Sequence, residues 1–437
     1  MVKVITYGTY DLLHYGHIKL LERAKALGDY LIVGVTADDF DKTRGKINVQ
    51  QSLMERIEAV RATGLADKII VEEYEGQKID DIRRYDVDIF TVGSDWAGKF
   101  DYLKEYCKVV YLERTEGISS SEIRSEERKI RLGIIGDSPI AKKYIREAQY
   151  VNGLEVVAIC TNNPKYFENI EDIPIVTDSY ISMLEYVDAV YIVSTPQNHY
   201  NQILCALKQR KHVLCESPVA LNKQQSEKLF SLASEKGCIL MDAIKTAYST
   251  AYSRLLLLAK EGKIGDIYSV DATCTSIRSV MEDSWDSICG WGPTAMLPIL
   301  NILGSEYRSK NIVSHIDSNG CDQFTKIDFL YDHAVASAKV AKGVKSEGEL
   351  IISGTQGYIY VPAPWWKTDY FEIRYEDSSQ NKRYFYQLDG EGIRYELVAF
   401  TRAIESGRNL SYVNSKISNN ICEIIGDFYL GRNRRVI

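Results

Sequence analysis

The chain opens on the stretch that decides the fold of its first part, Gly8-Thr9-Tyr10-Asp11-Leu12-Leu13-His14-Tyr15-Gly16-His17. The apolar run 2–7 before it predicts a first parallel strand, and residues 18–27 after it have helical apolar spacing up to a stop at Gly28. His14 and His17 are three residues apart at the helix start, so both imidazoles lie on one face. There they join the backbone N–H groups and the positive dipole end of a helix start, which favour an anion. This arrangement suits a nucleoside triphosphate whose α-phosphate is attacked while pyrophosphate leaves.

A bare pair of histidines at this spacing also fits a helix cap or half of a zinc site. The surrounding sequence is more specific, because residues 6–25 resemble the opening of the glycerol-3-phosphate cytidylyltransferases, members of the H-x-G-H nucleotidyltransferase superfamily. The resemblance continues in the same order through residues 36–40, 93–101 and 114–121. It covers roughly the first 125 residues, a common length for one domain.

This resemblance implies that His14 and His17 contact the CTP phosphates and stabilise the pentacovalent transition state, with Lys46 and Arg114 neutralising phosphate charge. The implied CTP-binding residues are Gly8, Thr9, Tyr10, His14, His17, Lys46, Asp95, Arg114, Thr115, Glu116, Gly117, Ile118, Ser119, Ser120 and Ser121. Lys78 aligns with a lysine that binds the acceptor phosphate, and Arg44 stands where the family usually has a second acceptor-side lysine. A guanidinium presents a fork where an ammonium is a point charge, so the acceptor could differ from glycerol 3-phosphate. Taken singly, Arg44, Lys46 and Lys78 also fit solvated surface charges.

Length and composition describe an ordinary globular protein with room for more than this domain. The 437 residues allow two or three domains, with 45% hydrophobic and 26% charged residues. The net charge of −7 predicts no general affinity for nucleic acid or anionic membranes. The start directly in strand and motif predicts no N-terminal signal, and no apolar run approaches the about 20 residues of a membrane span. The 9 cysteines have no metal-binding spacing and are typical of reduced thiols in a cytoplasmic protein.

A second βαβ pattern begins after a boundary near residues 125–130. A strand at 130–136 leads into Gly136-Asp137-Ser138-Pro139-Ile140-Ala141 and a helix, and a further strand follows at 154–160. This is the layout of a dinucleotide-binding half-domain. Ser138 replaces the glycine at which the backbone approaches pyrophosphate, and Thr161 follows the second strand where an acidic ribose ligand is usual. These residues alone fit a nucleotide-free Rossmann-like fold as well as a cofactor site.

Four further motifs, at 193–200, 211–218, 261–267 and 354–357, resemble the glucose–fructose oxidoreductase and inositol dehydrogenase family (Gfo/Idh/MocA) over nearly all of 130–437. The resemblance implies an α/β chain in which a dinucleotide-binding Rossmann domain precedes an α+β domain with a large, mostly antiparallel sheet. Alternating apolar residues at 325–331 and 348–353 fit that sheet. The expected domains are 1–129, 130–248 and 249–437. The implied NAD or NADP contacts are Gly136, Asp137, Ser138, Ile140, Ala141, Thr161, Thr195, Pro196 and Glu216.

The catalytic hallmarks of that family are altered. Its Glu-Lys-Pro motif stands here as Glu216-Ser217-Pro218, and the acid expected at 291–298 is missing. A hydroxyl–carbonyl redox reaction needs a proton donor beside the hydride path. The candidates are Lys245, Ser217 and His199. Lys245 also fits an ordinary strand-end lysine, and His199 also fits a helix cap.

Three functions fit this sequence. We favour a cytidylyltransferase that makes CDP-glycerol, or a related CDP-polyol, and pyrophosphate with Mg²⁺, fused to an oxidoreductase-like domain that reduces the carbonyl precursor. Alternatively the C-terminal half is a catalytically silent cofactor- or partner-binding module, or the first site serves another acceptor or another base, as in flavin or coenzyme A synthesis. The resemblance further implies small-molecule substrates, a homodimer or higher oligomer, and a bacterial role in teichoic acid or capsule synthesis. No side-chain metal cluster, nucleic-acid partner or membrane partner is expected.

Overall fold

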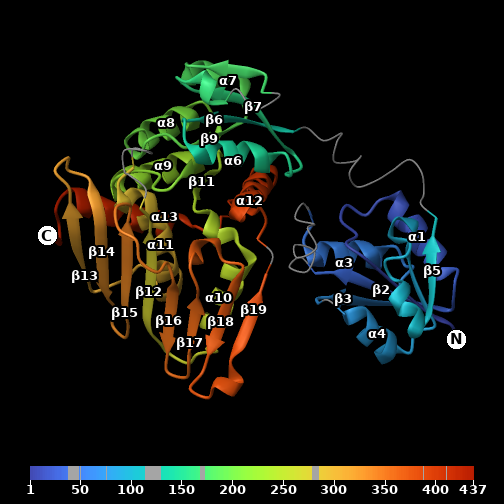
Figure 1. The fold of residues 1–437 in the computed structure, drawn as a ribbon. Helices are drawn as coiled ribbons and strands as arrows, with labels where there is room; N and C mark the ends of the chain where they lie inside the picture. Colours follow the sequence, from blue (N-terminus) through green and yellow to red (C-terminus); the bar gives the residue numbers. More distant parts are fainter. Residues whose placement is uncertain are drawn as a thin grey trace. The chain divides into compact units, whose positions relative to one another are not determined.

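The computed structural model describes residues 1–37, 49, 51–74, 76–113, 129–167, 173–277, 285–386, 388–409 and 411–437. The chain divides into two compact units, Met1–Arg128 and Lys129–Ile437 (Figure 1). Each unit has buried hydrophobic clusters of its own.

The first unit is built on a five-stranded sheet in the order β3-β2-β1-β4-β5, with every pair parallel. Its strands are β1 (Lys3–Gly8), β2 (Tyr30–Thr36), β3 (Lys68–Glu72), β4 (Ile89–Gly93) and β5 (Lys108–Leu112). Its helices are α1 (Tyr15–Lys25), α3 (Leu53–Ala62) and α4 (Gln77–Tyr85). Val4 packs with Leu21 of α1 and Ile57 of α3, whereas the next residue, Ile5, packs with Ile82 of α4. Helices therefore cover both faces, as an all-parallel sheet requires.

The strand order reverses beside β1, because the chain first adds β2 and β3 on one side and then β4 and β5 on the other. Such a switch point is where ligands bind in open α/β sheets, outside the carboxyl ends of the strands. The expected first strand and helix are confirmed, although the helix begins at Tyr15 rather than Ile18 and ends at Lys25.

The second unit begins with a six-stranded parallel sheet in the order β11-β10-β9-β6-β7-β8. Its strands are β6 (Ile130–Ile135), β7 (Leu154–Cys160), β8 (Ile175–Thr177), β9 (Ala189–Ile192), β10 (His212–Glu216) and β11 (Leu240–Ala243). Its helices are α6 (Pro139–Ala148), α7 (Tyr180–Tyr186), α8 (Pro196–Lys208) and α9 (Lys223–Lys236). This is the expected Rossmann sheet.

A nine-stranded sheet follows, in the order β19-β18-β17-β16-β12-β15-β14-β13-β20. Its strands are β12 (Ile267–Thr275), β13 (Ser309–Ile316), β14 (Asp322–Leu330), β15 (Val335–Ala341), β16 (Leu350–Gly354), β17 (Tyr358–Val361), β18 (Tyr370–Arg374), β19 (Lys382–Phe385) and β20 (Arg434–Val436). Only β12–β15 and β13–β20 pair in parallel, so the expectation of a mostly antiparallel sheet is confirmed. Two further helices, α10 (Thr250–Lys260) and α11 (Ser287–Leu303), accompany it, and α11 packs on β12 and β15.

The last helices, α12 (Ile393–Ser406) and α13 (Ser415–Tyr429), return to the Rossmann sheet. Figure 1 shows α12 beside α6, and α13 contacts α9 through a hydrogen bond from Ser226 to Asn419 of 2.6 Å. The C-terminal part of the chain therefore completes the core of the Rossmann part. Across the described ranges, no helix combines the length and apolar character that a membrane crossing needs.

Candidate active sites

The turn after β1 has an unusual backbone. Tyr10 and Leu12 have φ angles of 53° and 47°, in a region that side chains other than glycine rarely occupy. The buried Tyr10 ring folds back over Gly8, where a Cβ would lie 3.0 Å from the ring carbon Cζ. Because glycine has no side chain, position 8 leaves the space that the Tyr10 ring occupies. Local strain of this kind concentrates where surrounding structure enforces it, often at binding sites.

The two histidines lie together at the start of α1. His14 is the N-cap, and its Nδ1 accepts a hydrogen bond of 3.1 Å from the backbone N–H of Gly16. Since Nδ1 accepts, the proton of the neutral imidazole resides on Nε2, which makes Nε2 a donor. The His14 and His17 rings stack with centroids 3.9 Å apart, and Tyr10 meets His17 edge-on at 5.6 Å. The sequence-predicted pair is therefore one imidazole surface at a helix N-terminus.

The side chain of Arg56 holds this turn in place, a role that the sequence pattern did not reveal. Its buried guanidinium donates hydrogen bonds to the carbonyl oxygens of Thr9 (2.7 Å), Thr36 (2.8 Å) and Gln51 (3.1 Å). It thereby links the end of β1, the end of β2 and the start of α3. Arginine is common on exposed helix faces, so the spacing of α3 carries no signal that this side chain points inward.

Lys78 lies in a small hollow next to the turn. The hollow is lined by Tyr7, Gly8, Thr9, Thr36, Lys78, Val92, Trp96 and Phe100. The Lys78 ammonium pairs with Glu72 and lies 4.7 Å from the Tyr7 ring centroid. Asp95, in the 3₁₀ turn after β4, is exposed at the same edge of the sheet. The structure thus brings Lys78 to Gly8 and Thr9, whereas Arg44, Lys46 and residues 114–121 lie outside the described residues.

In the second unit, the loop after β6 keeps the geometry of a dinucleotide turn. Gly136 has a φ of 121°, and a Cβ there would lie 2.7 Å from the carbonyl carbon and oxygen of Val193. Only glycine fits so close to the end of the neighbouring strand. Ser138 is the N-cap of α6, and Ile140 and the buried Ala141 stand in its first turn. Despite Ser138, the turn has the form that a pyrophosphate site needs.

The ends of β6 and β7 are joined by a hydrogen bond. The hydroxyl of Thr161 donates to Asp137 over 2.5 Å. The sequence suggested that the ribose position lacks an acid, because none follows β7. Thr161-Asn162-Asn163 do follow β7, and the nearby carboxylate belongs to Asp137, in the loop after β6. These residues therefore fit a dinucleotide.

His199 lies in α8 between two loops. Its Nδ1 and Nε2 are each 2.8 Å from a backbone carbonyl oxygen, of Pro218 and Ser194 respectively. Burial lowers its pKa, and the ring is fully enclosed. This position favours a structural role, in which the ring holds two loops together, over proton transfer to a substrate. Thr195, the N-cap of α8, and the buried Pro196 precede it at the carboxyl edge of the sheet.

Buried and half-buried acids gather where the family hallmark is altered. Tyr191 donates a 2.5 Å hydrogen bond to Glu216, and Tyr144, stacked on Tyr191 with centroids 3.9 Å apart, donates to Glu396. Burial raises the pKa of Glu216 to about 7 against the opposing hydrogen bond from Tyr191, and it raises the pKa of Glu396 well above its usual range. Both carboxyl groups can therefore hold a proton near neutral pH.

Two of the proposed donors lie beside these acids. Ser217 is buried, and burial raises the pKa of its neighbour Asp242 to about 6. The positive charge of Lys245 is close enough to Glu216 to oppose the rise in its pKa, while its Nζ lies 2.9 Å from Glu391. Sequence reasoning missed Tyr144, Tyr191, Asp242 and Glu396, because nothing in a short apolar strand or an amphipathic helix marks a side chain that meets a distant partner.

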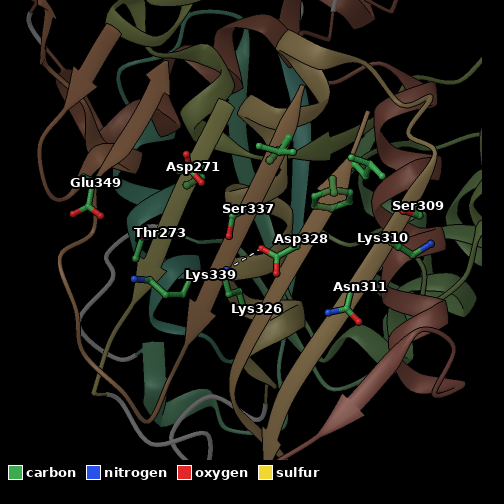
Figure 2. Close-up of a pocket in the computed structure, with 15 residues that line it drawn as sticks. Asp271, Thr273, Ser309, Lys310, Asn311, Lys326, Asp328, Ser337, Lys339 and Glu349 are labelled. Carbon is green, nitrogen blue, oxygen red and sulfur yellow. Dashed lines mark ion pairs between the residues drawn. The ribbon is translucent and has the colours of Figure 1, made fainter. Parts of the chain in front are cut away.

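A polar hollow of about 630 Å³ lies elsewhere, over strands β12–β15 (Figure 2). Lys326 and Asp328 pair within it at 2.9 Å, and Lys310 pairs with Asp427 at 2.7 Å. None of the residues predicted from sequence lines it. Within the described part of the chain, no group of three or more His, Cys, Asp or Glu side chains is placed to hold a metal ion.

Comparison with known proteins identifies the first unit. Residues 5–126 match the family model described as cytidylyltransferase-like. The glycerol-3-phosphate cytidylyltransferase of Bacillus spizizenii is 52% identical over 126 residues, which cover 29% of this chain and 97% of that protein. The chain belongs to the cytidylyltransferase-like family. The Staphylococcus aureus enzyme of the same name is 50% identical over 130 residues, 29% of this chain and 95% of that protein.

The second unit of this cytidylyltransferase-like chain has an oxidoreductase fold. Residues 130–243 match the model of the oxidoreductase family with an NAD-binding Rossmann fold. A 3-ketoreductase from Actinomadura kijaniata, solved with NADP and TDP-benzene, superposes with a TM-score of 0.63 over 71% of this chain and 99% of that one, at 21% identity. The two resemblances found in the sequence, to a cytidylyltransferase and to a Gfo/Idh/MocA oxidoreductase domain, are confirmed.

Proposed function

We propose that the first unit transfers the cytidylyl group of CTP to glycerol 3-phosphate, or to a closely related polyol phosphate, with CDP-glycerol and pyrophosphate as products. The observation that carries this proposal is the stacked pair of His14 and His17 at the start of α1, at the switch point of the sheet. Similarity to glycerol-3-phosphate cytidylyltransferases over nearly their whole length supports the acceptor.

In this proposal an oxygen of the acceptor phosphate attacks the α-phosphorus of CTP, and the bond to pyrophosphate breaks. His14 Nε2 and His17 donate to the phosphoryl oxygens, where charge grows in the transition state. The N-terminus of α1 adds its dipole, and Lys78 holds the acceptor phosphate beside Gly8 and Thr9. Mg²⁺, which would be held mainly by the triphosphate, would supply charge neutralisation for the leaving group.

We infer that the second unit reduces a carbonyl compound with NAD(P)H. The cofactor would supply the hydride, and Gly136, Asp137, Ser138 and Thr161 would hold it. The substrate oxygen needs a proton, and Glu216 can give one because burial raises its pKa to about 7. Ser217 has a hydroxyl pKa far too high for this task unaided. Fusion to the transferase suggests that the alcohol product is the polyol phosphate that the first unit consumes.

The setting of these reactions is also a proposal. We infer a reducing, cytoplasmic compartment, because all nine cysteines remain thiols. Similarity to bacterial glycerol-3-phosphate cytidylyltransferases supports a role in supplying CDP-glycerol. We further propose that this CDP-glycerol serves teichoic acid or capsule synthesis and that the chain forms a homodimer or higher homo-oligomer.

The experiment that tests the transferase is pyrophosphate release by the full chain with Mg²⁺, either CTP or ATP, and glycerol 3-phosphate, phosphocholine or phosphoethanolamine. We expect release only with CTP and glycerol 3-phosphate, and CDP-glycerol by mass spectrometry. Faster release with ATP or with either amino-alcohol phosphate would overturn the proposed substrates. For the reductase, the expected result is NAD(P)H oxidation by a phosphorylated ketone, and no cofactor binding in calorimetry would leave the second unit as a silent module.

A further inference from the structure

Three lysines of the second unit converge on one carboxylate. Lys143, Lys245 and Lys367 place their Nζ atoms 3.0, 2.9 and 2.8 Å from oxygens of Glu391. These four residues are called the lysine cluster below. Lys143 lies in α6, Lys245 follows β11, and Lys367 ends a 3₁₀ turn after β17, so both parts of the second unit contribute. The cluster thus stands where the Rossmann part meets the nine-stranded sheet.

The backbone that carries Glu391 is tightly held. Gly390, Glu391 and Gly392 have φ angles of 56°, 55° and 91°. A Cβ at Gly390 would lie 2.2 Å from a carboxylate oxygen of Glu147, and one at Gly392 would lie 2.7 Å from the carbonyl oxygen of Lys245. A left-handed conformation at a non-glycine residue costs of order 1 kcal/mol and persists where the surroundings impose it. The position of Glu391 among the lysines is therefore built into the fold.

The cluster carries more positive than negative charge. Burial would raise the pKa of Glu391, but hydrogen bonds from Lys245, Lys367 and Lys143 hold it well below its usual range, so the carboxylate is ionised. Three ammonium groups facing one carboxylate leave an excess of two positive charges. The adjacent pair of Arg394 and Glu147, 2.8 Å apart, is neutral in itself.

The buried acids nearest to Lys245 do not cancel this excess. Burial raises the pKa of Glu216 to about 7 and that of Glu396 well above its usual range, although Lys245 opposes both shifts. At pH 7 the carboxyl group of Glu216 is about half protonated and that of Glu396 stays protonated, so the two together offset only part of the excess positive charge. The like charges of the lysines repel one another, and a second anion would relieve that repulsion.

Solvent reaches the cluster. The side chains of Lys143 and Lys367 are 47% and 37% exposed, and that of Lys245 is 19% exposed. Lys245 lies near Glu216, the proton donor of the proposed reduction. We propose that the lysine cluster is a phosphate subsite that holds the phosphomonoester of a phosphorylated carbonyl substrate. A phosphomonoester dianion matches the excess of two charges, and its ammonium contacts would be charge-assisted hydrogen bonds. The role in reduction rests on the proposed function, whereas the anion site does not.

The test is calorimetric titration of the full chain with inorganic phosphate. The test variant is Lys143→Gln combined with Lys367→Gln, and the control is Lys223→Gln combined with Lys416→Gln, two exposed lysines that also pair with glutamates. We expect the test variant to lose one class of phosphate sites, or to bind there at least about tenfold more weakly. Phosphate bound by the first unit would be unchanged in every variant. Identical isotherms for wild type and test variant would overturn the proposal.

A second variant separates an anion site from an ion-pair network with only a structural role. Glu391→Gln removes the competing carboxylate, so we expect tighter phosphate binding and a phosphate-dependent rise in melting temperature larger than that of wild type. A lower melting temperature that phosphate does not restore would contradict the proposal. With NAD(P)H, the test variant should raise KM for glycerone phosphate and leave KM for glycerone unchanged. Loss of phosphate binding in a chain that reduces neither ketone would support the anion site and remove the proposed reductase activity.

Discussion

The hydroxyl of Thr161 donates a hydrogen bond of 2.5 Å to Asp137, across the ends of β6 and β7. We propose that the Asp137 carboxylate accepts from the ribose 2′-hydroxyl of NAD and repels the 2′-phosphate of NADP, as the acid after the second strand does in dinucleotide-binding folds. The second unit should therefore bind NADH more tightly than NADPH. We expect Asp137→Asn to lower the ratio of the Kd for NADPH to the Kd for NADH by about tenfold, or ~1.4 kcal/mol.

Fluorescence titration with both cofactors measures this preference. Asp377→Asn, a change of an exposed acid that caps a turn between β18 and β19, is the matched control and should bind as wild type does. If the wild-type chain binds NADPH more tightly than NADH, Asp137 does not bind the ribose 2′-hydroxyl.

The transferase reaction should depend on both histidines. Because we propose that His14 and His17 donate to the phosphoryl oxygens where charge grows, His14→Ala and His17→Ala should each lower kcat by roughly 10²–10³-fold. Pyrophosphate release under saturating CTP and glycerol 3-phosphate is the measurement. His315→Ala, at an exposed position of β13, should leave kcat unchanged. Near-normal turnover by either active-site variant would remove that histidine from the mechanism.

Lys78 should act on the acceptor and not on the nucleotide. Its ammonium lies in the hollow beside Gly8 and Thr9, so Lys78→Met should raise KM for glycerol 3-phosphate about tenfold or more while changing KM for CTP little. Lys104→Met, which alters an exposed lysine paired with Asp101, is the control. An equal rise in both KM values would place Lys78 on CTP or in a purely structural pair with Glu72.

Arg56 should stabilise the first unit. Arg56→Met removes the hydrogen bonds to the half-buried carbonyl group of Thr9 and to the buried carbonyl group of Thr36, and loss of a buried hydrogen bond costs about 1–3 kcal/mol. We expect a lower unfolding temperature for the first unit and loss of transferase activity, with cofactor binding by the second unit retained. Calorimetric unfolding measures the change, and Arg61→Met, on the exposed side of α3, is the control. Equal stability of both variants would contradict this role.

Protons should stabilise the second unit. Burial raises the pKa of Glu216 from 4.5 to about 7, although its partners Tyr191 and Lys245 oppose the shift and Asp242 adds to it. The folded chain therefore binds more protons than the unfolded chain between pH 4.5 and 7, so this contribution is complete below that window and is lost as pH rises through it. Urea unfolding across the window should show the decline, and Glu216→Gln should flatten it. A stability that rises with pH and is unaffected by Glu216→Gln would contradict this assignment.

The sequence predicted those features that depend on the local pattern of residues. The first strand, the histidines at a helix start and the turn at Gly136 all follow from short-range spacing, and the structure confirms them. Long-range partners could not be predicted in this way. The contacts of Tyr144 with Glu396 and of Lys143 with Glu391 span 252 and 248 residues, and they depend on how the C-terminal segments pack back on α6. The hydrogen bond between Thr161 and Asp137 was not predicted for the same reason, since the two residues follow different strands.

We propose that one chain carries out two consecutive reactions. The most direct test of this proposal is pyrophosphate release by the full chain with CTP, Mg²⁺ and glycerone phosphate, with and without NADH. We expect release only when NADH is present, NADH oxidation in equal amount, and CDP-glycerol as product. Release with glycerol 3-phosphate, but none with glycerone phosphate and either NADH or NADPH, would contradict the claim and leave the second unit without a step in this reaction sequence.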